Sequence, residues 1–356
     1  MARNVSDAEQ KRGSPAPSQV GWEAELPRTG TGVAHGKVIL LGEHAAVYGA
    51  PTVALPVPGV GCRARVVRSD RAGGGMLSFR LVQTPPGVPC GPMSVSSHAP
   101  KSRVPEGLWE LTGAMLRQAD LRGAPGVDVL VESGVPSARG LGASAACARA
   151  VAQALNNLLG LRLNAEAVFH FVQMSENTVH GKASGIDALA TGSHRPVLLA
   201  GGRISNPTVG TDGWIVVADS GSGASTKEAV TMLRESFTKH PGSRETFLSR
   251  SVALTRAGLR DLKRGHLVAL GKCLTSCHQL LDGLELTTDR TNHLVEAALN
   301  AGALGAKMSG GGLGGCVIAL TATERTADAL AAVLAREPGV RCWTAPVTKG
   351  ESHAGI

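Results

Sequence analysis

The chain has 356 residues, of which 43% are hydrophobic and 3% aromatic, and it carries a formal net charge of +8. At about 150 residues per domain, this length predicts about two domains, with cores built mainly from Val, Leu and Ala. The positive charge suits anionic partners, but the sequence has no dense Lys/Arg block with interleaved aromatics, which argues against nucleic-acid binding.

The seven cysteines are odd in number and form no CxxC pair. Cys273, Cys277 and His278 lie close together in the sequence, but no second ligand pair follows them, so a zinc site is disfavoured. We expect reduced, mostly buried thiols in a cytoplasmic protein. No apolar run reaches the roughly 18–20 residues that span a bilayer, and the N-terminus lacks the apolar region of a signal peptide.

The first part of the chain predicts a tail followed by strands. Residues 1–28 are polar, and we expect them to form a disordered tail. The apolar run at 36–44 is bounded by glycines and is typical of a buried strand. The alternating stretches at 62–67 and 77–82 predict a hairpin region. Residues 84–105 are rich in Pro, Ser and Gly and predict a loop that could cover a site.

Helices and one strand are expected next. Residues 106–119 have helical spacing, 126–133 alternate strictly and predict a strand, and 143–159 carry apolar residues at helical intervals. Asn164 can cap a further helix that runs to about Asn177.

The second half of the chain predicts mostly helices between strands. Strands are expected at 214–220 and 315–320, and a last helix precedes a last strand. The intervening helical patterns lie near 226–237, 245–262, 264–281 and 289–301. The Gly/Pro-rich stretch at 195–212 predicts a boundary, so we place an N-terminal domain at 29–200 and a C-terminal domain at 201–356.

A glycine loop, "GLGAS" (Gly140–Ser144), lies between the strand at 126–133 and the helix at 143–159. Its backbone N–H groups and the helix N-terminus could hold a phosphate, and Ser144 could cap the helix or reach a metal bound to that phosphate. A tight turn is the alternative. The loop lacks the third glycine of a dinucleotide fingerprint, and Gly36-Lys37 lacks the rest of a P-loop.

Polar residues gather after the first strand and before the strand at 315–320. Lys37 lies at the edge of the first strand, and Glu43 and His44 follow it directly, where a cleft could form or a histidine could simply complete a turn. Residues 310–315 hold five glycines, a density expected where the backbone passes close to a ligand or to another backbone.

Two carboxylates follow the glycine loop. Glu176, which we expect to end a helix, and Asp187 are eleven residues apart on consecutive predicted helices joined by a turn, and Ser184 can cap the second helix. One carboxylate could hold Mg²⁺ while the other accepts a proton. A pair of helix caps is the alternative.

Together these stretches resemble the GHMP kinase superfamily, named for galactokinase, homoserine kinase, mevalonate kinase and phosphomevalonate kinase. The motifs "GKVILLGEHAAVYG" (36–49), "PSARGLGASAA" (136–146) and "KMSGGGLGGC" (307–316) occur in the family's order. The resemblance spans roughly residues 30–345, and "ENTVHGKASGID" (176–187) makes it most similar to the mevalonate kinases.

The resemblance implies an α+β, two-domain fold with a ribosomal-protein-S5-like N-terminal domain and a ferredoxin-like C-terminal domain. It implies ATP-dependent phosphorylation of mevalonate at its 5-hydroxyl, with ATP and Mg²⁺ as cofactors, in a cytoplasmic homodimer that binds neither nucleic acid nor membranes. Phosphomevalonate kinase, another small-molecule kinase and a non-catalytic nucleotide-binding regulator stay open as alternatives. The failed fingerprint disfavours a dinucleotide-dependent oxidoreductase.

The resemblance also implies roles for individual residues. ATP would be bound by Ser133, Ala138, Arg139, Gly140, Leu141, Gly142, Ala143 and Ser144. Mg²⁺ would be held by Ser144 and Glu176. Asp187 would accept the hydroxyl proton beside Lys37, and the substrate would contact Lys37, Glu43, His44 and Asp187.

Three positions depart from the family's usual pattern. Arg139 replaces a small residue, Ala143 replaces the first serine of the usual GLGSS, and Lys182 replaces a less charged residue. The sequence leaves open whether Arg139 reaches the nucleotide or points outward.

Overall fold

The computed structural model describes residues 27–69, 77–84, 104–119, 126–223, 226–240 and 242–348. Almost all of the predicted tail at 1–28 and most of the predicted loop at 84–105 lie outside these residues.

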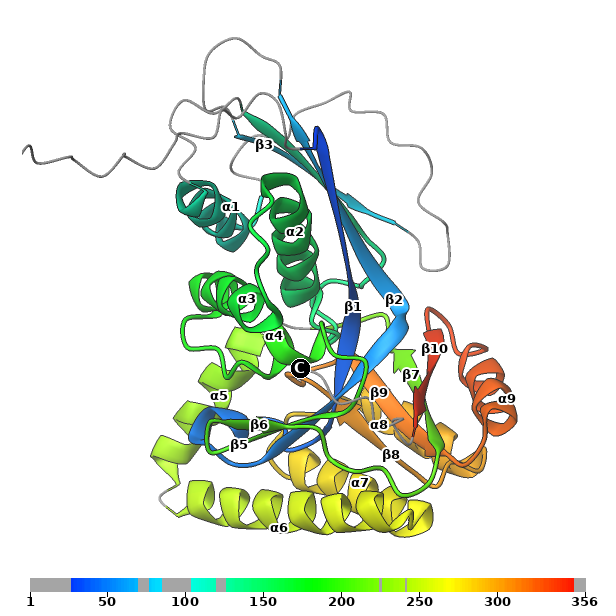
Figure 1. The fold of residues 1–356 in the computed structure, drawn as a ribbon. Helices are drawn as coiled ribbons and strands as arrows, with labels where there is room; N and C mark the ends of the chain where they lie inside the picture. Colours follow the sequence, from blue (N-terminus) through cyan, green and yellow to red (C-terminus); the bar gives the residue numbers. More distant parts are fainter. Residues whose placement is uncertain are drawn as a thin grey trace, which may run out of the picture.

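A six-stranded sheet forms the first half of the fold (Figure 1). The central strand, β2, pairs antiparallel with β1, β4 and β5, while β3 and β6 continue the sheet at its two edges. The strands are β1 (Thr29–Leu41), β2 (Thr52–Arg68), β3 (Leu77–Gln83), β4 (Val127–Ser133), β5 (Val197–Ala200) and β6 (Arg203–Ser205), and a short 3-10 helix, η1 (Ala46–Tyr48), separates β1 from β2.

The predicted hairpin between residues 62–67 and 77–82 is wrong. Both stretches are strands, but β4 lies between them in the sheet, and β3 pairs with β4 in parallel. Parallel strands need a crossover connection, and helix α1 (Glu106–Gln118) lies in the chain that joins β3 to β4. Alternation therefore identified the strands correctly and their partners incorrectly.

Helices α1 to α4 lie along one face of this sheet (Figure 1). They are α1, α2 (Ala143–Leu159), α3 (Ala165–His180) and α4 (Ile186–Ala190). The alanine-rich α2 packs directly on β1 and β2. The Asn164 side chain caps α3 by accepting the Ala167 N–H, as predicted. Helix α3 continues to His180, so Glu176 lies one turn before its end rather than at it.

The second half contains a four-stranded antiparallel sheet with the order β10-β7-β9-β8. Its strands are β7 (Gly213–Asp219), β8 (Gly305–Ser309), β9 (Cys316–Thr321) and β10 (Arg341–Val347). The helices are α5 (Thr226–Lys239), α6 (Ser243–Arg264), α7 (Leu267–Asp282), α8 (Asp289–Asn300) and α9 (Glu324–Leu334). Helices between β7 and β8 and between β9 and β10 give the β-α-β-β-α-β succession of a ferredoxin-like unit.

Strands β1 and β2 begin at Thr29 and Thr52, earlier than the stretches at 36–44 and 62–67 predicted, and two further parts of the sequence contain strands that we did not predict. Residues 305–309 form β8, a short strand that ends where the glycine-rich stretch begins. The stretch at 195–212, predicted as a boundary, contains the paired strands β5 and β6. The domain limit that we place between residues 200 and 201 falls in the turn of this pair and stays a prediction.

One continuous hydrophobic core connects the two sheets. It contains Leu40 and Leu55 of the first sheet and Val217 and Ile318 of the second, all essentially inaccessible to solvent. The ends of β1 and β8 meet at this junction, where the Ser309 hydroxyl accepts the Ile39 N–H at 2.8 Å. The junction therefore fixes the first and third sequence motifs next to each other.

Candidate active site

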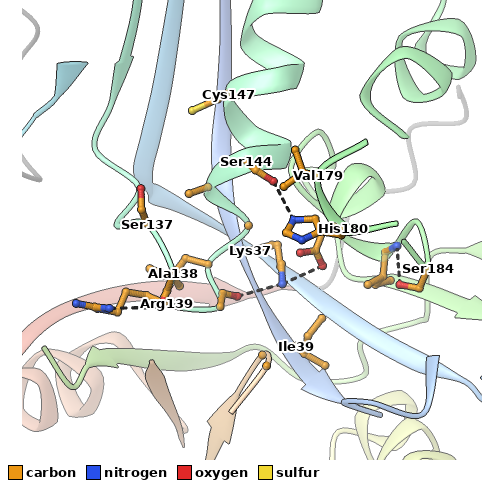
Figure 2. A pocket seen from close by; sticks show the side chains of 18 of the residues that line it. Lys37, Ile39, Ser137, Ala138, Arg139, Ser144, Cys147, Val179, His180 and Ser184 are labelled. Carbon is orange, nitrogen blue, oxygen red and sulfur yellow. Dashed lines mark hydrogen bonds and ion pairs between the residues drawn. The ribbon is translucent and has the colours of Figure 1, made fainter. Parts of the chain in front are cut away.

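A cavity of about 370 Å³ opens at the junction of the two sheets. The end of β1, the loop between β4 and α2, the turn between α3 and α4, and the loop after β8 all contribute to its wall (Figure 2). The predicted site residues that line it are Lys37, Glu43, His44, Ser133, Ala138, Arg139, Gly140, Leu141, Gly142, Ala143, Ser144 and Asp187. Glu176 is not among the lining residues and lies behind Ser144.

The loop between β4 and α2 presents its backbone to the cavity. Ala138, Gly140 and Gly142 have φ values of 56°, 76° and 71°, in the left-handed region, so the loop turns repeatedly within a few residues. Helix α2 begins directly after Gly142, and no side chain caps its N-terminus. Of the two roles considered for Ser144, the helix cap is therefore wrong, and contact with a phosphate-bound metal stays a prediction. The uncapped N–H groups and the helix dipole favour an anion at this point.

The glycine-rich stretch after β8 packs against this loop, backbone on backbone. A Cβ atom on Gly310 would lie 2.7 Å from the Gly140 Cα, and one on Gly140 would lie 2.7 Å from the Ser309 carbonyl oxygen. Both distances are too short for a real side chain. Of the two explanations for the glycine density, close approach to another backbone therefore holds at Gly310.

Lys37 and Asp187 both line the cavity, and their side chains form an ion pair. Lys37 Nζ lies 2.9 Å from the Asp187 carboxylate and donates to the Gly140 carbonyl oxygen at 3.0 Å. Asp187 is in the first turn of α4, and the N-cap position before this helix is Gly185, so no side chain caps it. The predicted cap by Ser184 is thus wrong, although its hydroxyl accepts the Ile186 N–H at 3.5 Å.

Ser144, Glu176 and His180 form a second polar group beside the first. The Ser144 hydroxyl donates to the Glu176 carboxylate and lies 3.4 Å from His180 Nε2 (Figure 2). Burial of the Glu176 carboxylate, helped by the nearby negative charge of Asp187, raises its pKa to about 7. Burial is also the main cause that lowers the pKa of His180.

This group fits a hard divalent cation. The raised pKa shows that nearby positive charge, including that of Lys37, does not offset the burial of this carboxylate, and carboxylate and hydroxyl oxygens are the ligands that Mg²⁺ accepts. Within the part of the chain that the structure describes, no cluster of three or more His, Cys, Asp and Glu side chains is arranged for a metal. A cation at Ser144 and Glu176 would therefore need further oxygens from a phosphate or water, as Mg²⁺ in nucleotide sites does.

Glu43 and His44 end the first motif and differ in their surroundings. The Glu43 carboxylate is buried in an ion pair with Lys307 of β8, which also donates to the Met308 carbonyl oxygen at 2.7 Å. His44 adopts a left-handed φ of 59° and buries its Nε2 without a hydrogen-bond partner. Burial lowers the pKa of His44 to about 4. The predicted substrate contacts of both residues stay predictions.

Arg139 lines the cavity, but its guanidinium group is directed away from Lys37 (Figure 2). Its Nε lies 3.0 Å from the carboxylate of Asp219, at the end of β7. The site therefore contains an Arg–Asp pair that joins the loop to the second sheet.

Three residues near the site were not singled out from the sequence. His180 is one helical turn after Glu176, and that spacing could have identified it. Lys307 and Asp219 gave no signal of their own. Lys307 is in the middle of β8 and Asp219 at the end of β7, and only the tertiary fold brings each to its partner.

Family models match both halves of the chain. The model described as GHMP kinases N terminal domain matches residues 108–194, and the model described as GHMP kinases C terminal matches residues 259–340. With the fold and the phosphate-type loop, these matches define a kinase that uses ATP as its phosphate donor, and the chain belongs to the GHMP kinases.

Relatives that match most of the chain show which GHMP kinases it resembles. The mevalonate kinase of Pyrococcus horikoshii is 32% identical over 295 residues, which cover 80% of this chain and 86% of the relative. The mevalonate kinase of Aeropyrum pernix is 33% identical over 303 residues, which cover 83% and 89%. The chain is thus a member of the mevalonate kinase family, and the predicted family is confirmed.

A solved structure confirms the predicted fold. The L. major mevalonate kinase in complex with R-mevalonate superposes with a TM-score of 0.73 at 22% identity, over 88% of this chain and 95% of that one. At this identity the likeness concerns the fold alone. No helix in the described ranges is long and apolar enough to cross a membrane.

Proposed function

We propose that this protein transfers the γ-phosphoryl group of ATP to the 5-hydroxyl of mevalonate. The observation that carries the proposal is the Asp187 carboxylate, paired with Lys37 at 2.9 Å in a cavity that also receives the uncapped N-terminus of α2. Family membership supports mevalonate as the substrate, and the Asp187–Lys37 pair beside the N-terminus of α2 supports a general base next to a phosphate site.

Asp187 would accept the hydroxyl proton of the substrate. The carboxylate is about one-third exposed, toward the cavity, while Lys37 is almost fully buried behind it. A fixed ammonium group next to the carboxylate places positive charge where the alcohol loses its proton. Phosphoryl transfer depends mainly on such positioning and charge stabilisation.

The loop from Ala138 to Ser144 would bind the phosphates through its backbone N–H groups and the N-terminus of α2. Ser144 and Glu176 would hold Mg²⁺, which when bound would neutralise charge on the β- and γ-phosphate oxygens. Ala143 keeps the backbone of this loop and lacks only the hydroxyl that the family's serine carries at this position.

A coupled ADP-release assay tests the proposal. Purified full-length protein is given ATP, Mg²⁺ and, in turn, mevalonate, phosphomevalonate, galactose and homoserine. We expect mevalonate-dependent ADP release and a product phosphorylated at the 5-hydroxyl. Turnover with phosphomevalonate alone would instead identify a phosphomevalonate kinase. Intact ATP binding without turnover of any of the four substrates would favour a non-catalytic nucleotide-binding regulator. The predicted homodimer and cytoplasmic location stay predictions.

A further inference from the structure

Asp219 is a fully buried carboxylate at the end of β7, and the cavity does not include it. One of its oxygens lies 3.0 Å from Arg139 Nε and accepts the Gly221 N–H at 3.0 Å. The other lies 2.7 Å from Arg341 of β10. A buried carboxylate requires this degree of pairing, because removing it from water without partners is strongly unfavourable.

Arg139 makes a second contact with the same turn. Its Nη2 donates to the Gly221 carbonyl oxygen at 3.0 Å, so one guanidinium group contacts both the carboxylate at the end of β7 and the backbone just beyond it. The two backbones also press together here, since a Cβ atom on Gly223 would lie 2.3 Å from the Ala138 carbonyl oxygen. The contacts of the Arg139 guanidinium group with Asp219 and Gly221 therefore hold it against the end of β7 in the second sheet.

The loop that carries Arg139 needs such anchoring. Ala138 is held at a φ of 56°, which is unfavourable for a residue with a Cβ atom, and Gly140 and Gly142 are also left-handed. Lys37, on β1 of the first sheet, anchors one side of the loop. Its backbone N–H donates to the Leu141 carbonyl oxygen at 2.9 Å, and its Nζ donates to the Gly140 carbonyl oxygen. The Arg139 contacts supply the matching anchor on the second sheet.

We infer that Arg139 is a positioning residue, which fixes the phosphate loop on the turn after β7 and makes no contact with the nucleotide itself. This inference rests on the proposed function, because it assumes that the loop holds the phosphates of ATP. It gives a role to the arginine that this chain has where the family usually has a small residue: the side chain keeps the loop amides in a binding arrangement before ATP arrives. Preorganisation of this kind improves binding by lowering the cost of ordering the site.

The Arg139→Ala variant tests whether the side chain positions the phosphate loop, as distinct from stabilising the fold as a whole. In this variant Asp219 keeps Arg341 and the Gly221 N–H, so the buried carboxylate is still paired and the fold is retained. We expect the Kd and KM for ATP to rise about tenfold while kcat stays within about twofold, because the loss affects ground and transition states alike. Arg139→Lys keeps one charged donor and should give an intermediate Kd.

Arg290→Ala is a matched control. Arg290 also pairs with a carboxylate at 3.0 Å, that of Glu337, and donates to a backbone carbonyl oxygen, that of Pro338. It is similarly exposed but contacts no part of the phosphate loop. Its removal should leave the Kd for ATP unchanged, whereas an equal rise in both variants would overturn the inference.

Hydrogen exchange in the nucleotide-free protein distinguishes positioning from direct contact. Two amides are hydrogen-bonded around the loop, Lys37 N–H to the Leu141 carbonyl oxygen and Gly315 N–H to the Ser222 carbonyl oxygen. Loss of Arg139 should speed exchange of both amides, because the anchor acts without ATP. A residue that only contacts the nucleotide would leave this exchange unchanged, and that result would overturn the inference. Neither the exchange nor the ATP titration uses mevalonate, so failure of the proposed substrate leaves this test intact.

Asp219→Asn completes the test. If Arg139 acts through Asp219, this variant and the double variant with Arg139→Ala should show the same rise in Kd as Arg139→Ala alone, as expected for two members of one unit. Fully additive effects would overturn the inference. If circular dichroism shows that Asp219→Asn does not fold, the exchange rates of Arg139→Ala decide the question.

Discussion

Asp187 and Lys37 are separated by 150 positions in the chain and by 2.9 Å in the structure. If Asp187 is the general base, Asp187→Ala should lower kcat by about 100- to 10,000-fold, the usual contribution of a positioned base. The Kd for ATP should change little, because the phosphates are held by the loop. Steady-state kinetics and calorimetric titration measure the two quantities. Asp328→Ala, an exposed change on α9, is the control, and a variant of Asp187 that keeps a tenth of wild-type kcat would exclude the base role.

His44 makes stability depend on pH. Its pKa is about 4 in the folded protein, lowered by burial from an ordinary value of 6.5. The unfolded chain therefore binds the proton more readily, so this contribution to stability is present above pH 6.5 and is lost as the pH falls toward 4. The full shift corresponds to at most about 3 kcal/mol.

The His44→Asn variant should flatten this part of the profile, and asparagine tolerates the left-handed φ at this position. Urea unfolding between pH 4 and 7 measures the effect, with the exposed His240→Asn as control. A variant that loses as much stability on acidification as the wild type would show that other groups are responsible.

At the scale of elements, the contact between the β4–α2 loop and the glycine-rich stretch after β8 is the most constrained. Gly310→Ala should displace the loop, raise the KM for ATP and lower the free energy of unfolding by about 1–3 kcal/mol. Gly302→Ala is a matched control: Gly302 has a φ of 93°, close to the 96° of Gly310, but no atom lies within 4 Å of its added Cβ. Equal effects of the two variants on KM would mean that backbone strain, not contact with the loop, is the cause.

Local sequence patterns predicted the helices and strands better than they predicted which strands pair in the sheets. The strand at Val127–Ser133, the helix at Ala143–Leu159 and the cap at Asn164 follow from alternation, helical spacing and side-chain chemistry, all of which act within a few residues. The parallel pairing of β3 with β4 depends on a crossover, and no local pattern encodes it. Strand β8 was missed because it is short and runs directly into glycines.

The same limit applies to the site. The sequence motifs identified Lys37, Ser144 and Asp187 as site residues, because each motif has its characteristic residues at a fixed spacing. All three line the same cavity in the structure. The contacts of Arg139 with Asp219 and of Glu43 with Lys307 cross between the two sheets. Such pairs depend on how the sheets dock, which a single sequence does not specify.

At the scale of the molecule, the hydrophobic core runs through both sheets without interruption. The two halves should therefore unfold together, in one calorimetric transition. Leu55→Ala in the first sheet should lower the midpoint of that whole transition, since truncation of a buried leucine costs about 2–5 kcal/mol. Two separate transitions, with only one of them shifted by Leu55→Ala, would show that the halves are independent.

The buried ion pair of Lys307 with Glu43 has a consequence for the chemical reactivity of the protein. The Lys307 amine is inaccessible to solvent, so an acylating reagent cannot reach it while β1 and β8 remain docked. Mass spectrometry should find rapid modification of the exposed Lys272 and none of Lys307 in the native protein. The rate at which Lys307 becomes labelled would then measure how often the two sheets separate, which makes this one side chain a built-in reporter of opening at the junction.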